Sequence, residues 1–440
     1  MFPPTVASDR RLFAANADFA ARVRTKVQAI SEICENWHDS AGMLQGYTYL
    51  GQFLAHDIVS REVPGMPVSI RSRKLDLDSV YGSGVRFDAE GRFLYTAASA
   101  THAKDLLRDA STRRACIPEF RNDQHVILAQ LHLTVQLFHN AALDAIRGSA
   151  AGRGLGCDEC FETARGYVVA SLQRIYVEDY LSVCCDQAIY RLHRDGLLRV
   201  FELPASETDL PYEISHAALR FGHSQVRESY LLNRSEESTE LGELFSLSGL
   251  LGGADFQGVP HLKAVDWRRF FDWGAASAGI VSDSGRRINP KVVEPMSALP
   301  EPPVASVIAR NIEAGCRVQL PSGQAIAMHL GRMGIDRRIV PALQLQPRDA
   351  HQEFKLRAAG LWDESPLWLY VLLEASALGG DGLRLGPLGS VFLCETVRSA
   401  LQGMPAYGAV QAHCREAFGL PRVASFVQLA RFADPLTYGG

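Results

Sequence analysis

Three short stretches of this chain carry side chains that could act together in one chemical step. The first, residues 51–57, contains Gln52 and His56, which share a helical face at i and i+4. The second supplies Arg121, and the third, much later in the chain, ends in His223. A neutral imidazole can take and return a proton near neutral pH, and a guanidinium stabilises negative charge on a leaving oxygen. A second imidazole can ligate a haem iron, and an iron so held, with a base and a guanidinium opposite, cleaves peroxides.

Taken together and in this order, the three stretches resemble the animal-type haem peroxidases, the superfamily that also contains the cyclooxygenases. The resemblance runs from about residue 45 to about residue 400 and is closest to bacterial members. Further matching blocks are His139-Asn140, residues 266–271 (DWRRFF), 320–324 (LPSGQ), 365–372 (SPLWLYVL) and 384–390 (RLGPLGS). The resemblance implies a large, mainly helical domain with few short strands.

The family pattern implies roles for the first two stretches. His56 would be the acid/base on the peroxide side, and Arg121 would stabilise charge on the leaving oxygen. Gln52 would hold a water molecule or a halide. The alternatives are a His56 whose hydrogen bonds are satisfied in the core and an exposed Arg121 that begins a helix.

The third stretch and a later asparagine match the family's iron-binding side. The resemblance implies that His223 ligates the haem iron and that Arg220 pairs with a haem propionate. Asn311 stands where the family keeps an asparagine that accepts a hydrogen bond from the ligand's ring N–H. An ordinary turn with a hydrogen-bonded histidine is the alternative.

Residues 71–83 resemble the family's calcium segment, which usually ends in the letters VYGS. Calcium takes several oxygen ligands from carboxylates, hydroxyls and carbonyls. The candidate ligands are Asp57, Asp76, Asp78, the Ser72 hydroxyl and the Lys74 carbonyl. A polar turn whose aspartates cap nearby helices is the alternative.

The chain departs from the family pattern at several positions. Ala55 and Gln124 replace two carboxylates that form ester bonds to haem in related enzymes, so we expect a non-covalent haem b. Ala314 replaces a second propionate-binding arginine. Arg220 stands where cyclooxygenases and alpha-dioxygenases have their radical tyrosine, which disfavours fatty-acid dioxygenation.

These observations predict a haem peroxidase that reduces hydrogen peroxide and oxidises a small organic substrate. Two alternatives remain open. One is a haem-dependent oxygenase or dioxygenase that tailors a dedicated substrate, and the other is a haem-binding scaffold without peroxidase turnover.

The overall composition disfavours some classes of binding partner. The 440 residues are 47% hydrophobic and carry a net charge of −4, which argues against nucleic acid or an anionic membrane as the main partner. The first residues lack a signal-peptide pattern and no apolar run approaches ~20 residues, so we expect no membrane span and a cytoplasmic location. The nine cysteines predict reduced thiols, and the spacing of Cys157 and Cys160 leaves a metal or redox role open.

Hydrophobic spacing predicts the elements that must position these residues. Helices are expected over 16–36, 44–60, 123–147, 161–187 and 365–378, and a strand over 197–201. We expect Asn122 or Asp123 to cap the third helix, and Gly379–Gly382 to end the last. The composition shows no linker, so the expectation is one domain over residues 1–440.

Overall fold

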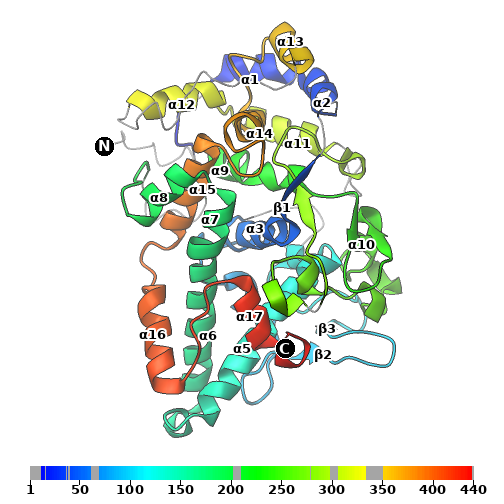
Figure 1. Cartoon of the computed structure of the whole chain (residues 1–440), viewed down its shortest axis with the longest axis vertical. Coiled ribbons are helices and arrows are strands. Elements are labelled where there is room, and N and C mark those ends of the chain that lie inside the picture. The colour runs from blue at the N-terminus through cyan, green and yellow to red at the C-terminus, as the bar shows by residue number, and fades with distance from the viewer. Residues whose placement is uncertain are drawn as a thin grey trace. The chain divides into compact units, whose positions relative to one another are not determined.

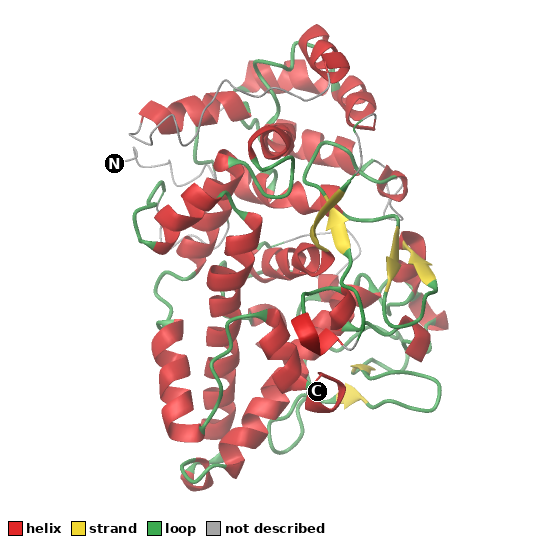
Figure 2. Cartoon of the chain, viewed as in Figure 1, coloured by secondary structure: helices red, strands yellow, loops and turns green. Residues whose placement is uncertain are grey.

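A computed structural model describes residues 11–14, 16–35, 37, 40–60, 69–201, 210–277, 279–297, 306–332 and 350–438. The fold is predominantly helical (Figure 1), which confirms the predicted fold class. The strands of this described part are short and form antiparallel pairs (Figure 2). These pairs are β1 (Ala41–Leu44) with β6 (Ser284–Arg286), β2 (Tyr95–Thr96) with β3 (Asp105–Leu106), and β4 (Ser229–Leu231) with β5 (Ser238–Glu240).

The chain divides into two compact units, each built from three separate stretches of sequence. The first unit comprises Met1–Thr48, Leu181–Glu228 and Ser284–Ser399. The second comprises Tyr49–Tyr180, Ser229–Asp283 and Ala400–Gly440. The expectation of one domain over residues 1–440 stays a prediction.

The second unit is organised around one long buried helix, α5 (Val126–Gly148). It packs against α6 (Cys157–Arg174) and α17 (Phe426–Ala433), and α6 in turn packs against α16 (Tyr407–Phe418). In the described part of the chain, α5 is the helix long and apolar enough to cross a membrane, but 83% of its most apolar window is buried. Burial of this kind is typical of a core helix. Also in this unit are α4 (Asp78–Tyr81), α10 (Leu241–Ser246), α18 (Pro435–Tyr438) and the short helices Phe120–Asp123 (η1), Gly152–Gly154, Gly253–Asp255, His261–Lys263, Trp267–Arg269 and Gly274–Ser277.

The predicted cap of α5 is wrong. The tight turn η1 precedes the helix, and His125 is the N-cap, its ring accepting from the Leu128 N–H. Asp123 is not available to cap because both of its carboxylate oxygens accept from Arg108, at 2.8 and 3.0 Å. Asn122 is not available because its amide joins two histidines, as described below.

Two other predicted helices are interrupted. The stretch 16–36 forms α1 (Ala17–Arg24) and α2 (Val27–Glu35). The stretch 161–187 begins earlier, as α6 from Cys157, changes to a π-helix over Ile175–Tyr180, and continues as α7 (Leu181–Cys184). At the start of α6, Cys157 is exposed and Cys160 is buried, and their role stays open.

In the first unit, the predicted helix over 365–378 is confirmed as α14 (Leu367–Leu378), which ends at Gly379. The predicted strand over 197–201 is wrong. The Leu197 and Leu198 N–H groups donate to the Leu192 carbonyl, and those of Val200 and Phe201 donate to the buried Glu395 carboxylate. Other helices of this unit are α8 (Gln187–Arg194), α9 (Tyr212–Ser215), Ala218–Gln225 (η4), Glu294–Ser297 (η9), α11 (Val307–Arg317), α12 (Gly323–Arg332), α13 (Ala350–Ala358) and α15 (Pro387–Ala400).

Candidate active site

His56 lies near the end of α3 (Gln45–Ile58), and its ring is buried. Its Nδ1 lies 2.9 Å from the side-chain oxygen of Asn122. Because a carboxamide oxygen only accepts, Nδ1 carries the proton and Nε2 keeps its lone pair. Burial, and next the Arg121 charge, lower the pKa of His56 to about 3. The imidazole is therefore neutral near pH 7, which the acid/base prediction requires.

Asn122 also contacts a second buried histidine, which the sequence analysis missed. Its amide nitrogen lies 3.1 Å from Nδ1 of His132, on the first half of α5. Because the amide nitrogen only donates, His132 Nδ1 accepts. The carboxamide is thus held from both ends, with its oxygen toward His56.

Gln52 lies one helical turn before His56 and has a histidine partner of its own. The His125 ring accepts from the Leu128 N–H at Nδ1, at 3.3 Å, so its proton lies on Nε2. Nε2 then donates to the side-chain oxygen of Gln52, at 3.2 Å. The amide nitrogen of Gln52 is left as the donor of this side chain. A histidine directly before a long apolar helix was the available signal for His125.

Arg121 is buried beside His56 and is held by a carboxylate that the sequence analysis missed. Its Nε and Nη2 donate to the two oxygens of Glu119, at 2.7 and 2.9 Å. Nη2 also donates to the carbonyl oxygens of His56 and Val59, at 3.1 and 2.7 Å. Burial alone would raise the pKa of Glu119, but the hydrogen bonds and charge of Arg121 lower it to about 2. The pair fixes Arg121 against the end of α3 and neutralises much of its charge. We call these seven residues the His56 cluster: Gln52, His56, Glu119, Arg121, Asn122, His125 and His132.

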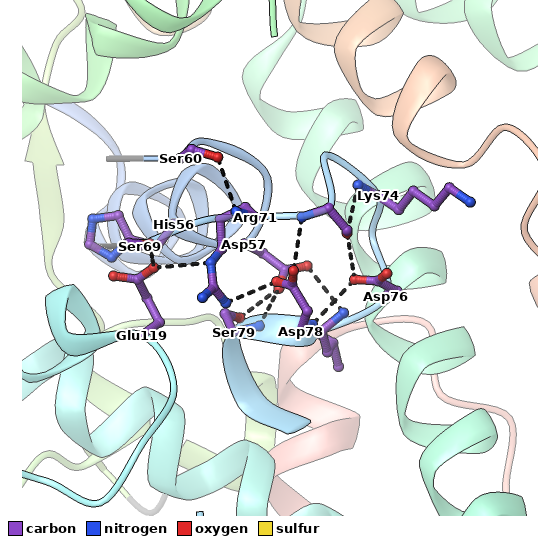
Figure 3. A network of polar contacts seen from close by, with 12 residues as sticks. His56, Asp57, Ser60, Ser69, Arg71, Lys74, Asp76, Asp78, Ser79 and Glu119 are labelled. Carbon is purple, nitrogen blue, oxygen red and sulfur yellow. Dashed lines mark hydrogen bonds and ion pairs between the residues drawn. The ribbon is translucent and has the colours of Figure 1, made fainter. Parts of the chain in front are cut away.

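The predicted calcium residues also come together in the second unit (Figure 3). Asp57 is fully buried and accepts from the Ser79 hydroxyl at 2.6 Å and from the Leu77 and Ser79 N–H groups. The Ser72 hydroxyl donates to Asp76 at 2.9 Å and accepts from the Lys74 N–H at 3.1 Å. Asp78 pairs with Arg71 at 3.0 Å.

The electrostatics of this loop are dominated by its carboxylates. Burial, together with the like charges of Asp78 and Asp76, raises the pKa of Asp57 to about 8 against the opposing hydrogen bonds from Ser79. Burial also raises the pKa of Asp78, against the opposing charge of Arg71. Within the described ranges, no group of three or more His, Cys, Asp or Glu side chains is arranged to hold a metal ion. The loop therefore brings together the carboxylates predicted to bind calcium. In this structure their oxygens accept hydrogen bonds from N–H and O–H groups instead.

In the first unit, the structure brings the predicted iron-side residues together. His223 and Arg220 lie on η4, half-buried, and Asn311 is buried on α11. The amide nitrogen of Asn311 lies 3.0 Å from Nδ1 of His223. The Asn311 oxygen accepts from Arg220 Nη1 at 3.3 Å. We call these three residues the His223 cluster.

The carboxamide of Asn311 is turned opposite to the expectation. Its nitrogen, rather than its oxygen, faces His223, so Nδ1 accepts and the ring proton lies on Nε2. The cause is Arg220, which takes the Asn311 oxygen. Asn311 is thus a hydrogen-bond partner of His223 in this structure, and the iron-side roles of both residues stay predictions.

A tryptophan that the sequence analysis did not single out supports η4. Trp368, buried on α14, donates from Nε1 to the Arg220 carbonyl at 3.2 Å. Trp368 and Asn311 also line a small pocket whose walls are mostly apolar. Its apolar walls limit the access of water to the buried amide.

Comparisons with known proteins agree with this fold. Residues 52–253 match the family model of the animal haem peroxidases. The fold is similar to that of peroxidase A from Dictyostelium discoideum, at 15% identity and a TM-score of 0.61, over 94% of this chain and 88% of that chain. It is also similar to a fatty acid alpha-dioxygenase from Oryza sativa, at 13% identity and a TM-score of 0.66, over 94% of this chain and 80% of that chain. A search of curated proteins finds no match.

The likeness to solved structures shows the fold, which is that of the haem peroxidases and alpha-dioxygenases. The match of residues 52–253 to the animal haem peroxidase family model agrees with this likeness of fold. The stronger likeness to bacterial members stays a prediction.

Proposed function

We propose that this chain is a haem-dependent peroxidase that reduces hydrogen peroxide and oxidises a small organic substrate. The observation that carries the proposal is the state of His56. Its Nδ1 is tied to Asn122, its ring is neutral, and its Nε2 lone pair remains available beside a fixed arginine. A general base in this form is what peroxide activation requires.

The residues of the His223 cluster fit a haem. The His223 imidazole would be a suitable axial donor through Nε2 once its proton lies on Nδ1, where the Asn311 side chain, turned so that its oxygen accepts, would orient the ring. A half-buried arginine beside it suits a propionate. Ala55 and Gln124 cannot form esters, so the haem would be a non-covalent haem b. When bound, it would supply the redox-active iron at which a peroxide bond is broken.

The chain's own groups would handle the proton and the charge. Nε2 of His56 would accept a proton from one peroxide oxygen and return it to the other. The amide nitrogen of Gln52 would donate a hydrogen bond to a bound oxygen. Arg121, whose charge is tempered by Glu119, would lower the energy of negative charge that develops nearby.

A second candidate is a haem-dependent oxygenase, because the fold is also that of the alpha-dioxygenases. The position three residues before His223 is Arg220 rather than tyrosine, which argues against the radical route that the family uses on fatty acids. Steady-state assays on the haem-reconstituted chain separate the candidates. We expect oxidation of a simple phenol such as guaiacol with hydrogen peroxide, and no oxygen uptake with palmitic acid. Oxygen uptake would favour the oxygenase, and bound haem with neither activity would favour a scaffold.

We also propose that the loop around Asp57, Asp76 and Asp78 binds calcium. Three carboxylates, one of them fully buried, lie close enough to repel one another, and a divalent cation would relieve that repulsion. Calcium at 100 times its Kd should stabilise the fold by about 2.7 kcal/mol. Thermal unfolding with calcium, with magnesium, and after chelation tests this. The control is an Asp76→Asn, Asp78→Asn double variant. If calcium raises the unfolding temperature of the wild type no more than that of this variant, the proposal is disproved.

A further inference from the structure

The turn η1 and the start of α5 contact both candidate peroxide-side groups through side chains that fix hydrogen-bond direction. Asn122 stands on η1, and His125 and His132 stand at the start and on the first half of α5. Asn122 contacts His56, and His125 contacts Gln52. These contacts join two helices that are distant in sequence.

The directions of these hydrogen bonds follow from the placement of the Asn122 oxygen and nitrogen and from the Leu128 N–H. The Asn122 oxygen only accepts, so it takes the proton of His56 Nδ1, while the Asn122 nitrogen donates to His132. The Leu128 N–H only donates, so it places the proton of His125 on Nε2, facing the Gln52 oxygen.

His132 has a feature that packing alone does not explain. It is fully buried, and its Nε2 has no hydrogen-bond partner in the described part of the chain. A buried N–H without a partner is costly, and an apolar ring against Phe53 would avoid that cost. What the imidazole provides, and an apolar ring would not, is the acceptor that holds the Asn122 amide.

We propose, resting on the peroxidase function above, that Asn122 is a positioning residue, held by His132, that keeps the proton of His56 on Nδ1. His56 then presents an acceptor at Nε2, while Gln52, held by His125, presents a donor one helical turn away. This pairing of acceptor and donor complements hydrogen peroxide, in which each oxygen can both donate and accept. Without Asn122, the proton of His56 is free to occupy Nε2, where it blocks the base.

The tautomer of His56 can be read without haem, in the full-length chain labelled with 15N at histidine. We expect the wild type to show the Nδ1–H form. Asn122→Ala should shift His56 toward the Nε2–H form, whereas Asn122→Asp, which still accepts, should keep Nδ1–H. His132→Phe should give a mixture, because the carboxamide can then turn over. His139→Phe, one heptad further along α5, is the matched control and should change nothing at His56.

The same variants are then reconstituted with haem, and the rate of the Soret change after hydrogen peroxide is measured. We expect Asn122→Ala to slow this rate by about 10- to 100-fold, the usual effect of removing such a supporting partner, and Asn122→Asp to recover most of it. An Nε2–H tautomer in the wild type, or an Asn122→Ala variant with unchanged tautomer and rate, would overturn the proposal. If the tautomers change as expected but the wild type does not react with peroxide, the positioning role stands and the peroxidase function fails.

Discussion

The His56 cluster and the His223 cluster both join a histidine to an asparagine side chain, but in opposite senses. At His56 the carboxamide oxygen faces the ring, so Nδ1 is protonated and Nε2 is a ready base. At His223 the carboxamide nitrogen faces the ring, so the proton lies on Nε2, the atom that would bind a metal. The first arrangement leaves an acceptor at Nε2 of His56, and the second leaves a donor at Nε2 of His223.

The difference arises from the second partner of each carboxamide. His132 accepts from the Asn122 nitrogen, which leaves the Asn122 oxygen toward His56. Arg220 donates to the Asn311 oxygen and thereby turns the amide. If His223 held a haem iron at Nε2, its ring proton would lie on Nδ1, and the Asn311 oxygen would have to face the ring to accept from it. Arg220 Nη1 would then give up the Asn311 oxygen, while Nε keeps its hydrogen bond to the Ser215 carbonyl, and Nη1 could donate to a propionate. The comparison teaches that the group bonded to one end of a carboxamide can determine which ring nitrogen of the histidine at the other end is protonated.

The largest expected effect comes from removing the histidine that must change state. His223→Ala should lower haem affinity by at least about 100-fold, because the axial donor is lost, and added imidazole should restore the spectrum in part. Haem titration followed at the Soret band measures this. His216→Ala, also half-buried in the same unit, is the control. Unchanged affinity in the His223 variant would refute the ligand assignment.

Removing His56 should leave haem binding unchanged. His56→Ala should leave the Soret spectrum nearly unchanged but slow the reaction with hydrogen peroxide by about 10²- to 10⁴-fold, the usual contribution of a general base. Stopped-flow spectroscopy measures the rate. A variant that reacts at the wild-type rate would remove His56 from the mechanism.

Two buried groups, one in each unit, should make the free energy of unfolding depend on pH in opposite directions. In the first unit, burial raises the pKa of Glu374 to about 8. The unfolded carboxyl ionises near 4.5, so the stabilisation present below that pH is lost as the pH rises from 4.5 to 8. Glu374→Gln should remove this loss, which amounts to at most about 1.4 kcal/mol per pH unit. Denaturant unfolding at pH 5 and pH 8 measures it, and an equal difference from wild type at both values would contradict it.

In the second unit, burial lowers the pKa of His139 to about 4. Its stabilising contribution is present above the unfolded pKa near 6.5 and is lost as the pH falls from 6.5 to 4. His139→Phe should therefore be less destabilising at pH 4.5 than at pH 7. A constant difference between these values would show that the ring is not held neutral.

The smallest effect is expected at Gln52. His125→Ser keeps an N-cap for α5, since serine caps well, but removes the donor that orients the Gln52 amide. The reaction with peroxide should slow by a few-fold, roughly the effect of one neutral hydrogen bond, with haem binding unchanged. Stopped-flow measurement alongside His56→Ala compares the two, and a larger loss than that of His56→Ala would reverse their ranking.

The sequence predicts the site better than its internal bonding. The helix that carries His56 follows from apolar spacing, and the grouping of Arg220 with His223 follows from their separation along the chain, whereas the helix that carries Asn311 was not predicted. Which atom of Asn122 or Asn311 faces its histidine depends on long-range competitors such as His132 and Arg220, which no local pattern reveals. The wrong cap of α5 has the same origin, because Asp123 is claimed by Arg108 from another segment.

The strand that was wrongly predicted over 197–201 also shows that a distant partner can override local preference. Its residues have the apolar character of a strand, yet the N–H groups of Val200 and Phe201 bond to Glu395, nearly two hundred residues away. The change to π-helix at Ile175 likewise leaves no mark in the apolar spacing.

The central claim is that the chain binds haem and activates peroxide. The most direct test is the visible spectrum of the purified chain reconstituted with haem, before and after one equivalent of hydrogen peroxide. We predict a ferric Soret band that shifts rapidly on addition of peroxide. Because no ester is formed, the haem should also be extractable from the chain. A chain that binds no haem, or whose bound haem leaves the Soret band unchanged after peroxide, would contradict the account.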